Sequence, residues 1–153
     1  MLEYGTPPDG GLLPSEIPDE LIQAYRAAHY RVLLPKTPFV LKVDTHSPEL
    51  ASLLKGSGLS SAAFITACNP FGRRAAENFN AKAQSSLKYD LLKEDCRLWD
   101  GIGEDPQGLW PAEPSFLALG IGLESAKFLG ERYAQNALLY CGPEALPKLI
   151  LLR

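Results

Sequence analysis

The chain has 153 residues, of which 46% are hydrophobic and 22% are charged, and its formal net charge is −3. This length and composition favour one globular domain that buries roughly two-thirds of the surface of its unfolded chain. The weak negative charge creates no field that would draw the chain to nucleic acid or to anionic membranes. We therefore expect no nucleic acid and no membrane among its partners.

The apolar runs of the sequence are all shorter than the ~20 residues of a membrane-spanning helix, and the first residues do not resemble a signal peptide. These features predict a cytoplasmic protein. Cys68, Cys96 and Cys141 are odd in number and widely spaced, and with His29 and His46 they form no metal-ligand motif. We expect no metal site, and the sequence leaves any cofactor unknown.

Residues 1–18 contain four prolines and three glycines, which predicts an extended N-terminal arm. A single α/β domain is then expected over residues 19–153. Apolar residues at helical spacing predict its first helix over 19–31, and the run Phe39-Val40-Leu41-Lys42-Val43 predicts the first strand.

The clearest helix start in the chain is the run Ser47-Pro48-Glu49. Serine caps the first turn, proline suits the first helical position, and glutamate favours the positive end of the helix dipole. The helix should end at Gly56, and an apolar strand over 62–68 should follow it. Strand, helix and strand in this order predict a parallel β-α-β unit.

The second half of the chain continues the alternation of helices and strands. Residues 93–114 differ, because two short apolar segments with Trp99 and Trp110 flank a tip rich in glycine, which predicts an antiparallel hairpin. The other predicted elements are a long helix after Gly72, a strand over 116–121, a helix over 122–135, a strand over 137–141 and an edge strand over 149–152. The sequence thus predicts a mixed, mostly parallel sheet flanked by helices.

A candidate anion site follows the strand over 62–68. Asn69 comes directly after this strand, and Arg73 and Arg74 lie in the first turn of the next predicted helix. Free backbone donors, a helix start and two guanidinium groups can together receive an anion. The competing interpretation is that Asn69 caps a turn and both arginines lie in solvent. Parallel strands would also place residues 44–46 at the same edge of the sheet.

Glu113 is the candidate acid or base. It lies between Trp110 and the apolar run that begins at Phe116, and desolvation there would raise its pKa. A structural role, as an acceptor for Trp99 or for backbone donors, fits the sequence equally well. Ser115 lacks the histidine and aspartate partners of a serine nucleophile.

Several short motifs occur in a fixed order along the chain: Asn69-Pro70-Phe71-Gly72, then Glu77-Asn78 and Asn80, then Trp110-Pro111-Ala112-Glu113-Pro114-Ser115-Phe116, then Gln135-Asn136-Ala137. Over residues 37–142 this series resembles the pattern of a small bacterial family, domain-of-unknown-function family 3293. The resemblance implies a compact bacterial domain and no assigned activity. It points to these polar positions: Asn69, Asn78, Asn80, Glu113, Ser115, Gln135 and Asn136. The pair Gln135-Asn136 can equally serve only to end the preceding helix.

Two functions are compatible with these residues. The first is binding of a small anionic or nucleotide-like ligand at the carboxyl edge of the sheet, with hydrolytic chemistry that uses Glu113. Asn69 would orient this ligand and the two arginines would neutralise it. The second is a non-catalytic interaction module whose exposed hairpin, with Trp99 and Trp110, contacts a partner. Substrate, catalysis and oligomeric state stay open at this point.

Overall fold

A computed structural model describes residues 15–153 of the chain. The predicted N-terminal arm, residues 1–18, lies outside the described residues except for 15–18. The helices are α1 (Asp19–Ala27), α2 (Pro48–Ser57), α3 (Glu77–Lys93) and α4 (Leu123–Arg132), with a 3₁₀ turn η1 (Pro70–Gly72). The strands are β1 (His29–Val32), β2 (Phe39–Leu41), β3 (Ala62–Ile65), β4 (Arg97–Glu104), β5 (Glu113–Leu119), β6 (Ala137–Cys141) and β7 (Lys148–Leu151).

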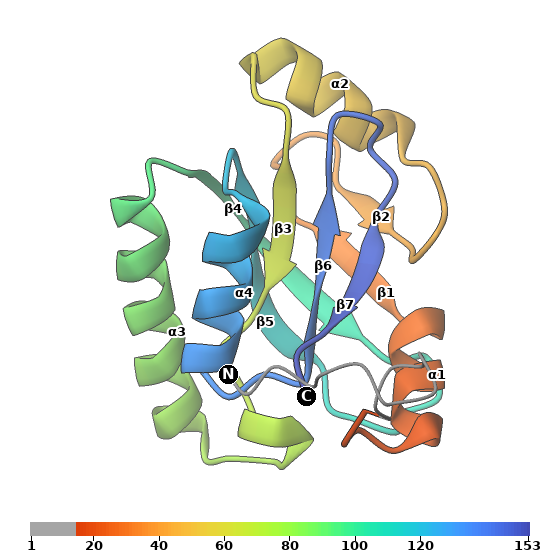
Figure 1. Cartoon of the computed structure of the whole chain (residues 1–153), viewed down its shortest axis with the longest axis vertical. Helices are drawn as coiled ribbons and strands as arrows, with labels where there is room; N and C mark the ends of the chain where they lie inside the picture. The colour runs from red at the N-terminus through yellow and green to blue at the C-terminus, as the bar shows by residue number, and fades with distance from the viewer. Residues whose placement is uncertain (1–14) are drawn as a thin grey trace, which may run out of the picture.

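All seven described strands form one sheet in the order β2-β1-β4-β5-β3-β6-β7, and every neighbouring pair is antiparallel. The sheet is curled, with helices against both of its faces (Figure 1). The predicted mixed, mostly parallel sheet is therefore wrong. Among the predicted pairings, the antiparallel hairpin is present, because β4 pairs with β5 across a connection over residues 105–112.

The error arose at the predicted β-α-β unit. β2 and β3 do flank α2 in the sequence, but β2 is at the edge of the sheet and β3 lies between β5 and β6. Strands β1, β4 and β5 lie between them in the sheet, and the helix predicted over residues 19–31 covers most of β1. In the structure α1 ends at Ala27, because Ala28 is extended, and β1 begins at His29.

The position of β2 also moves residues 44–46 away from the predicted site. Asp44 forms ion pairs with Arg26 and Lys148. The Nδ1 atom of His46 is 2.9 Å from the carbonyl oxygen of Glu144. Neither residue lines the pocket described below.

The predicted start of α2 is present, although the parallel pairing predicted for the strands on either side of it is wrong. The Ser47 side chain accepts a hydrogen bond from the Leu50 backbone N–H at 3.1 Å, and Pro48 occupies the first turn. Gly58 follows the helix with a φ of 72°, a left-handed conformation that glycine adopts at low cost. The predicted cap is confirmed, and the helix ends at Ser57, one residue later than predicted.

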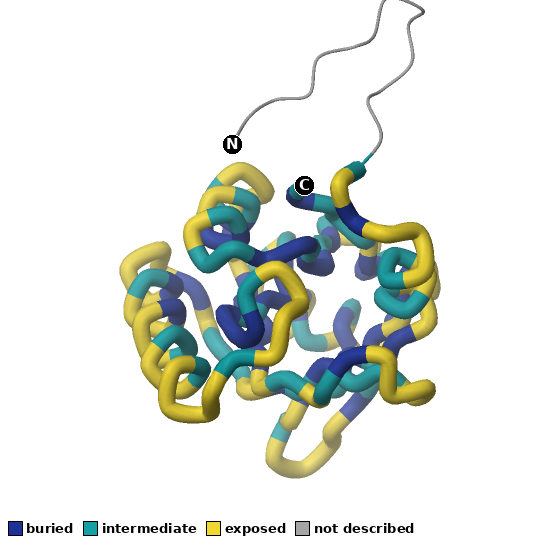
Figure 2. Tube along the Cα trace, turned by 90° about the horizontal axis from the view of Figure 1, so that it is seen from below, coloured by how far each residue is buried: buried dark blue, intermediate teal, exposed yellow. Residues whose placement is uncertain are grey.

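The core has two parts, one on each face of the sheet. Helices α1 and α2 cover one face, where Leu50 and Leu54 pack with strand residues such as Leu117. Helices α3 and α4 cover the other face, where Leu87 and Leu91 pack with alternate residues of the same strands. Figure 2 shows the buried parts of the trace inside the molecule and the exposed parts on the outer turns of the helices.

Candidate functional site

The end of β3 meets the beginnings of β5 and β6. Because β3 is antiparallel to both neighbours, its carboxyl end lies beside their amino ends. Asn69 follows β3, Glu113 begins β5, and Gln135 with Asn136 precedes β6. The sheet therefore gathers these polar residues at one rim, through antiparallel pairing and not through the parallel pairing that the sequence suggested.

Asn69 is held rigidly at this rim. Its φ is 51°, a left-handed conformation that asparagine tolerates better than most residues, and its side chain is buried. Its backbone N–H donates to Asn80 Oδ1 at 2.9 Å, and its Oδ1 accepts from Asn80 Nδ2 at 2.9 Å and from the Ala75 N–H at 3.0 Å. Its Nδ2 donates to Glu113 Oε2 at 2.9 Å. Asn69 thus both stabilises the turn and orients Glu113.

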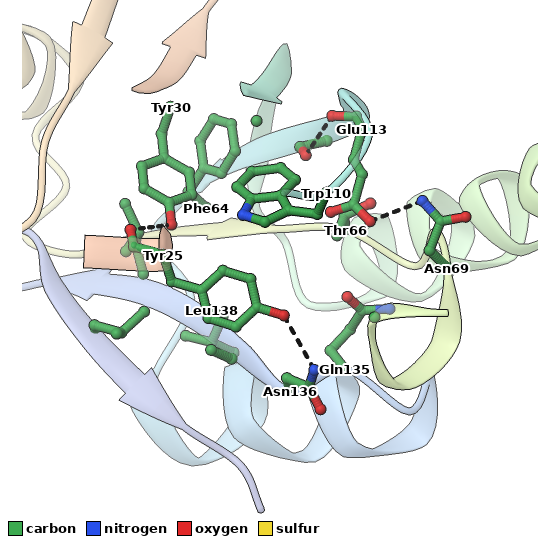
Figure 3. A pocket seen from close by; sticks show the side chains of 16 residues that line it. Tyr25, Tyr30, Phe64, Thr66, Asn69, Trp110, Glu113, Gln135, Asn136 and Leu138 are labelled. Atoms are coloured by element: carbon green, nitrogen blue, oxygen red, sulfur yellow. Dashed lines mark hydrogen bonds between the residues drawn. The ribbon is translucent and has the colours of Figure 1, made fainter. Parts of the chain in front are cut away.

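Asn69 and Glu113 lie at a cavity of about 50 Å³, which has room for a few water molecules or a small head group. Figure 3 shows side chains from α1, β1, β3, β5 and the segment before β6 around this space. One part of the wall is aromatic and consists of Tyr25, Tyr30, Phe64 and Trp110. The polar part consists of Thr66, Asn69, Glu113, Ser115, Gln135 and Asn136.

The aromatic rings pack against one another in pairs. The ring centroids of Tyr25 and Trp110 are 5.8 Å apart with tilted planes, and those of Tyr30 and Phe64 are 5.4 Å apart, edge to face. Burial raises the pKa of both tyrosines above its ordinary value, so the hydroxyl groups keep their protons at neutral pH. The wall is therefore uncharged apart from Glu113.

Glu113 is the only charged residue that lines this pocket among the described residues. Desolvation by burial raises its pKa to about 7, and the hydrogen bond from Asn69 opposes this shift in part. No described lysine or arginine forms an ion pair with it. Its second oxygen, Oε1, receives no hydrogen bond from residues 15–153. The carboxyl group can therefore accept a proton or an N–H donor near neutral pH.

Gln135 and Asn136 connect the segment before β6 to neighbouring parts of the chain through side-chain hydrogen bonds. Gln135 Nε2 donates to the carbonyl oxygens of Cys68 and Tyr133, at 3.0 and 3.1 Å. Asn136 Nδ2 donates to the Tyr25 hydroxyl at 3.0 Å, and its Oδ1 accepts from Arg153 Nη1 at 3.0 Å. Both residues line the pocket and hold its wall, and they lie beyond the end of α4.

The other predicted asparagines and the serine differ in their positions. Asn80 does not line the pocket but fixes Asn69 through two hydrogen bonds. Ser115 lines the pocket, and its hydroxyl donates to the Glu113 backbone carbonyl at 3.0 Å. Asn78 is exposed, and its Oδ1 accepts the N–H of Phe79. Of these three residues, only Ser115 lines the pocket.

The two arginines lie outside the pocket. Arg73 and Arg74 are both exposed, as the competing interpretation of this segment proposed. Arg74 lines a separate, open groove of about 800 Å³ between α3 and the residues just before β5. Asn69 lines both the groove and the pocket. A ligand with its head group in the pocket could thus place an anionic group in the groove, on the other side of Asn69.

The aromatic wall is not predicted from the sequence. The helix predicted over residues 19–31 contains Tyr25 and Tyr30 but assigns neither to a site. Trp110 was expected on an exposed hairpin, but its side chain is 7% exposed and lines the pocket. Trp99 is half-buried and packs against the core. These two rings therefore do not form the exposed hairpin surface that the interaction-module hypothesis requires.

Residues 15–153 hold no group of three or more histidine, cysteine, aspartate or glutamate side chains arranged for a metal ion. The three cysteines are buried and free. Across the described part of the chain, no helix has the length and apolar character needed to cross a membrane.

A family described as "Protein of unknown function (DUF3293)" matches residues 65–138 of the chain. The match confirms the resemblance given by the ordered motifs, over a shorter span than the predicted residues 37–142. It contains Asn69, Glu113 and Gln135-Asn136, and thus most of the polar part of the pocket. No curated protein and no solved structure matches the chain significantly.

Proposed function

Residues 65–138 match the family DUF3293, whose function is unknown, and supply the polar part of the pocket, from which we propose that the chain binds a small ligand at Glu113. The carboxylate accepts a hydrogen bond from an N–H group at the end of the ligand. Asn69 holds the carboxylate in place from the other side. The observation that carries this proposal is a largely buried carboxyl group without a cationic partner among the described residues, next to space for a head group.

The charge of the pocket decides which end of a ligand enters it. An unpaired carboxylate in a mostly apolar wall is costly, and a donor or cation that binds it lowers that cost. An anionic head group would instead be repelled. The open groove on the other side of Asn69 is lined by both Arg74 and Glu77, and Arg74 is the group there that would receive the anionic part of a nucleotide-like ligand.

Hydrolysis is the chemistry that we attach to this site. A carboxyl group with a pKa of about 7 is about half ionised at neutral pH, so it can take a proton from a water molecule beside the bound ligand. The alternative function as an interaction module receives no support from the hairpin, because Trp110 is buried and Trp99 packs on the core.

Three small molecules of nearly the same shape test the binding proposal. Acetate presents two acceptors, acetamide one acceptor and one donor group, and acetamidinium two donor groups with a positive charge. Titrations followed by ¹H–¹⁵N NMR at pH 8 should show acetamidinium and acetamide shifting the backbone signals of residues 66–69 and those of Glu113 and Ser115. Acetate should shift neither set.

The variant Glu113→Gln should weaken acetamidinium binding by about tenfold or more, because a hydrogen bond to a charged group is lost. Glu124→Gln is the matched control, since it removes the same charge from an exposed position on α4. Unchanged acetamidinium affinity in Glu113→Gln, or the absence of any shift at these residues, would refute the proposal.

A further inference from the structure

Gln135 presents an unpaired oxygen to the pocket. The residue is 7% exposed, and its Nε2 donates to the carbonyl oxygens of Cys68 and Tyr133 at 3.0 and 3.1 Å. Because carbonyl oxygens only accept hydrogen bonds, these contacts fix which end of the amide is the NH₂ group and leave Oε1 on the other side. Oε1 receives no hydrogen bond from residues 15–153. Figure 3 shows it pointing into the space below the Glu113 carboxylate.

This oxygen and Glu113 Oε1 are both open to the cavity with the side chains in their present positions. Among the described residues, the buried side-chain nitrogen and oxygen atoms that lack a hydrogen-bond partner are two indole nitrogens, so neither oxygen is sealed from solvent. Glu113 is fixed to Asn69 by a hydrogen bond of 2.9 Å, and Gln135 is fixed to the adjacent residue, Cys68. Both side chains thus border one cavity of about 50 Å³, which a compact head group can fill.

The other polar side chains of this wall have partners. The hydroxyl groups of Thr66 and Ser115 each donate to a backbone carbonyl oxygen. Both ends of the Asn69 and Asn136 amides are hydrogen-bonded. No lysine or arginine of the described chain lines the cavity. The two acceptors left open therefore face a space without a cation, and one of them belongs to a carboxylate.

The chemistry of these two oxygens selects the head group. Two acceptors require at least two donors, and a positive charge offsets the cost of the buried carboxylate. A primary ammonium group has three N–H donors, no acceptor and a positive charge on a single nitrogen. A planar amidinium or guanidinium group suits a carboxylate with two free oxygens, whereas Glu113 Oε2 already accepts from Asn69.

We infer that the head group of the ligand is a primary ammonium, which donates to both Glu113 Oε1 and Gln135 Oε1. This inference rests on the proposed binding at Glu113, and it adds the charge of the head group and the second acceptor. The ligand is thus an amine, and Gln135 contributes to its selection in addition to holding the wall. No ring or side chain has to move to expose either oxygen.

Four small molecules test the inference on the ¹⁵N-labelled full chain at pH 8. Methylammonium should shift the backbone signals of Asn69, Glu113 and Gln135 and the side-chain NH₂ signals of Gln135. It should bind about tenfold more tightly than acetamide, because its N–H donors carry a charge. Tetramethylammonium has the same charge without an N–H donor, and it should leave these signals in place. Acetamidinium tests the proposed binding at Glu113, and sodium chloride at equal concentration controls for ionic strength.

Gln135→Met gives the second readout, because it keeps a side chain of similar length and removes the oxygen. It should weaken methylammonium binding by about tenfold, as expected for the loss of a hydrogen bond to a charged group. Gln107→Met is the matched control at an exposed position between β4 and β5, and it should leave the affinity unchanged. The wild-type series decides the question even if Gln135→Met fails to fold.

The outcomes separate this inference from the proposed function. If acetamidinium binds at Glu113 while methylammonium does not, the inference is wrong and the proposed function stands. The inference is also wrong if tetramethylammonium or acetamide binds as tightly as methylammonium, or if folded Gln135→Met keeps the wild-type affinity for methylammonium. If none of the four molecules binds, both are wrong.

Discussion

The face of the sheet under α3 and α4 and the face under α1 and α2 are made by alternate residues of the same strands, and the cavity with Glu113 lies on the face under α1 and α2. On β5, Phe116 and Ala118 enter the core beneath α3 and α4. The alternate residues on the other face are Glu113, Ser115 and Leu117, so that this strand begins polar and becomes apolar. Because successive residues of a strand point to opposite faces, β5 contributes both to the filled core and to the wall of the cavity.

The difference shows what a polar pocket requires in a small domain. The face under α3 and α4 is filled by apolar side chains, and a carboxyl group there would lack a partner. On the pocket face, the rim where β3 ends and β5 and β6 begin supplies amide groups such as Asn69. The two faces should therefore respond differently to substitution.

The largest effect is expected on the filled face. Leu87→Ala removes a fully buried side chain of α3 and should lower the free energy of unfolding by about 2–5 kcal/mol. Lys88→Ala on the exposed side of the same helix should change it by less than about 0.5 kcal/mol. Urea denaturation measures both. A loss below about 1 kcal/mol for Leu87→Ala would contradict the description of this face as closely packed.

Glu113 should make the stability of the pocket face depend on pH. The folded state keeps the Glu113 proton up to a pH of about 7, whereas the unfolded chain releases it near pH 4 to 5. Between these values the folded state binds more protons, so the contribution of Glu113 to stability falls as the pH rises. The expected loss between pH 5 and pH 8 is of the order of 3 kcal/mol.

Glu113→Gln removes this titration. The variant should be close to the wild type in stability at pH 5 and more stable than it at pH 8, by up to about 3 kcal/mol. Urea denaturation at both pH values measures the difference, and Glu124→Gln should follow the wild type. A Glu113→Gln protein that is less stable than the wild type at pH 8 would show that a charged partner stabilises this carboxylate.

The sequence allowed several elements of the fold to be predicted, but not the directions of the strands. The cap at Ser47 and the strands predicted over 62–68 and 137–141 depend on local signals, and they are present, although the first of these strands ends at Ile65. Strand pairing depends on partners distant in sequence, and the unrecognised strand β1 takes the place between β2 and β4. Without β1, the segment from β2 to β3 has the appearance of a parallel unit.

The polar part of the site was predicted better than its aromatic wall. Asn69, Glu113 and Gln135 each adjoin an apolar strand, and polar residues at strand ends gather wherever those strands are neighbours in either direction. Tyr25 and Tyr30 come from α1 and β1, whose positions depend on the sheet order. Their sequence pattern is that of ordinary core residues, and it contains no signal for a pocket.

The smallest effects on stability are expected on the face under α1 and α2, where substitutions on β4 distinguish a closely packed position from one beside the cavity. Gly101 and Gly103 are both buried on β4. A Cβ on Gly101 would lie 2.7 Å from Phe64 Cε2 and 2.9 Å from the Arg31 carbonyl oxygen, whereas a Cβ on Gly103 would approach Trp110 no closer than 3.5 Å.

Gly101→Ala should therefore destabilise the fold by about 1–3 kcal/mol through overpacking. Gly103→Ala should change stability by less than about 0.5 kcal/mol. Because Gly103 lines the pocket, its added methyl group occupies part of a cavity of about 50 Å³ and should weaken acetamide binding although the fold is kept. Denaturation and acetamide titration of both variants measure the contrast. Equal losses of stability would mean that β4 is packed uniformly, and undiminished acetamide binding in Gly103→Ala would place the ligand away from this wall.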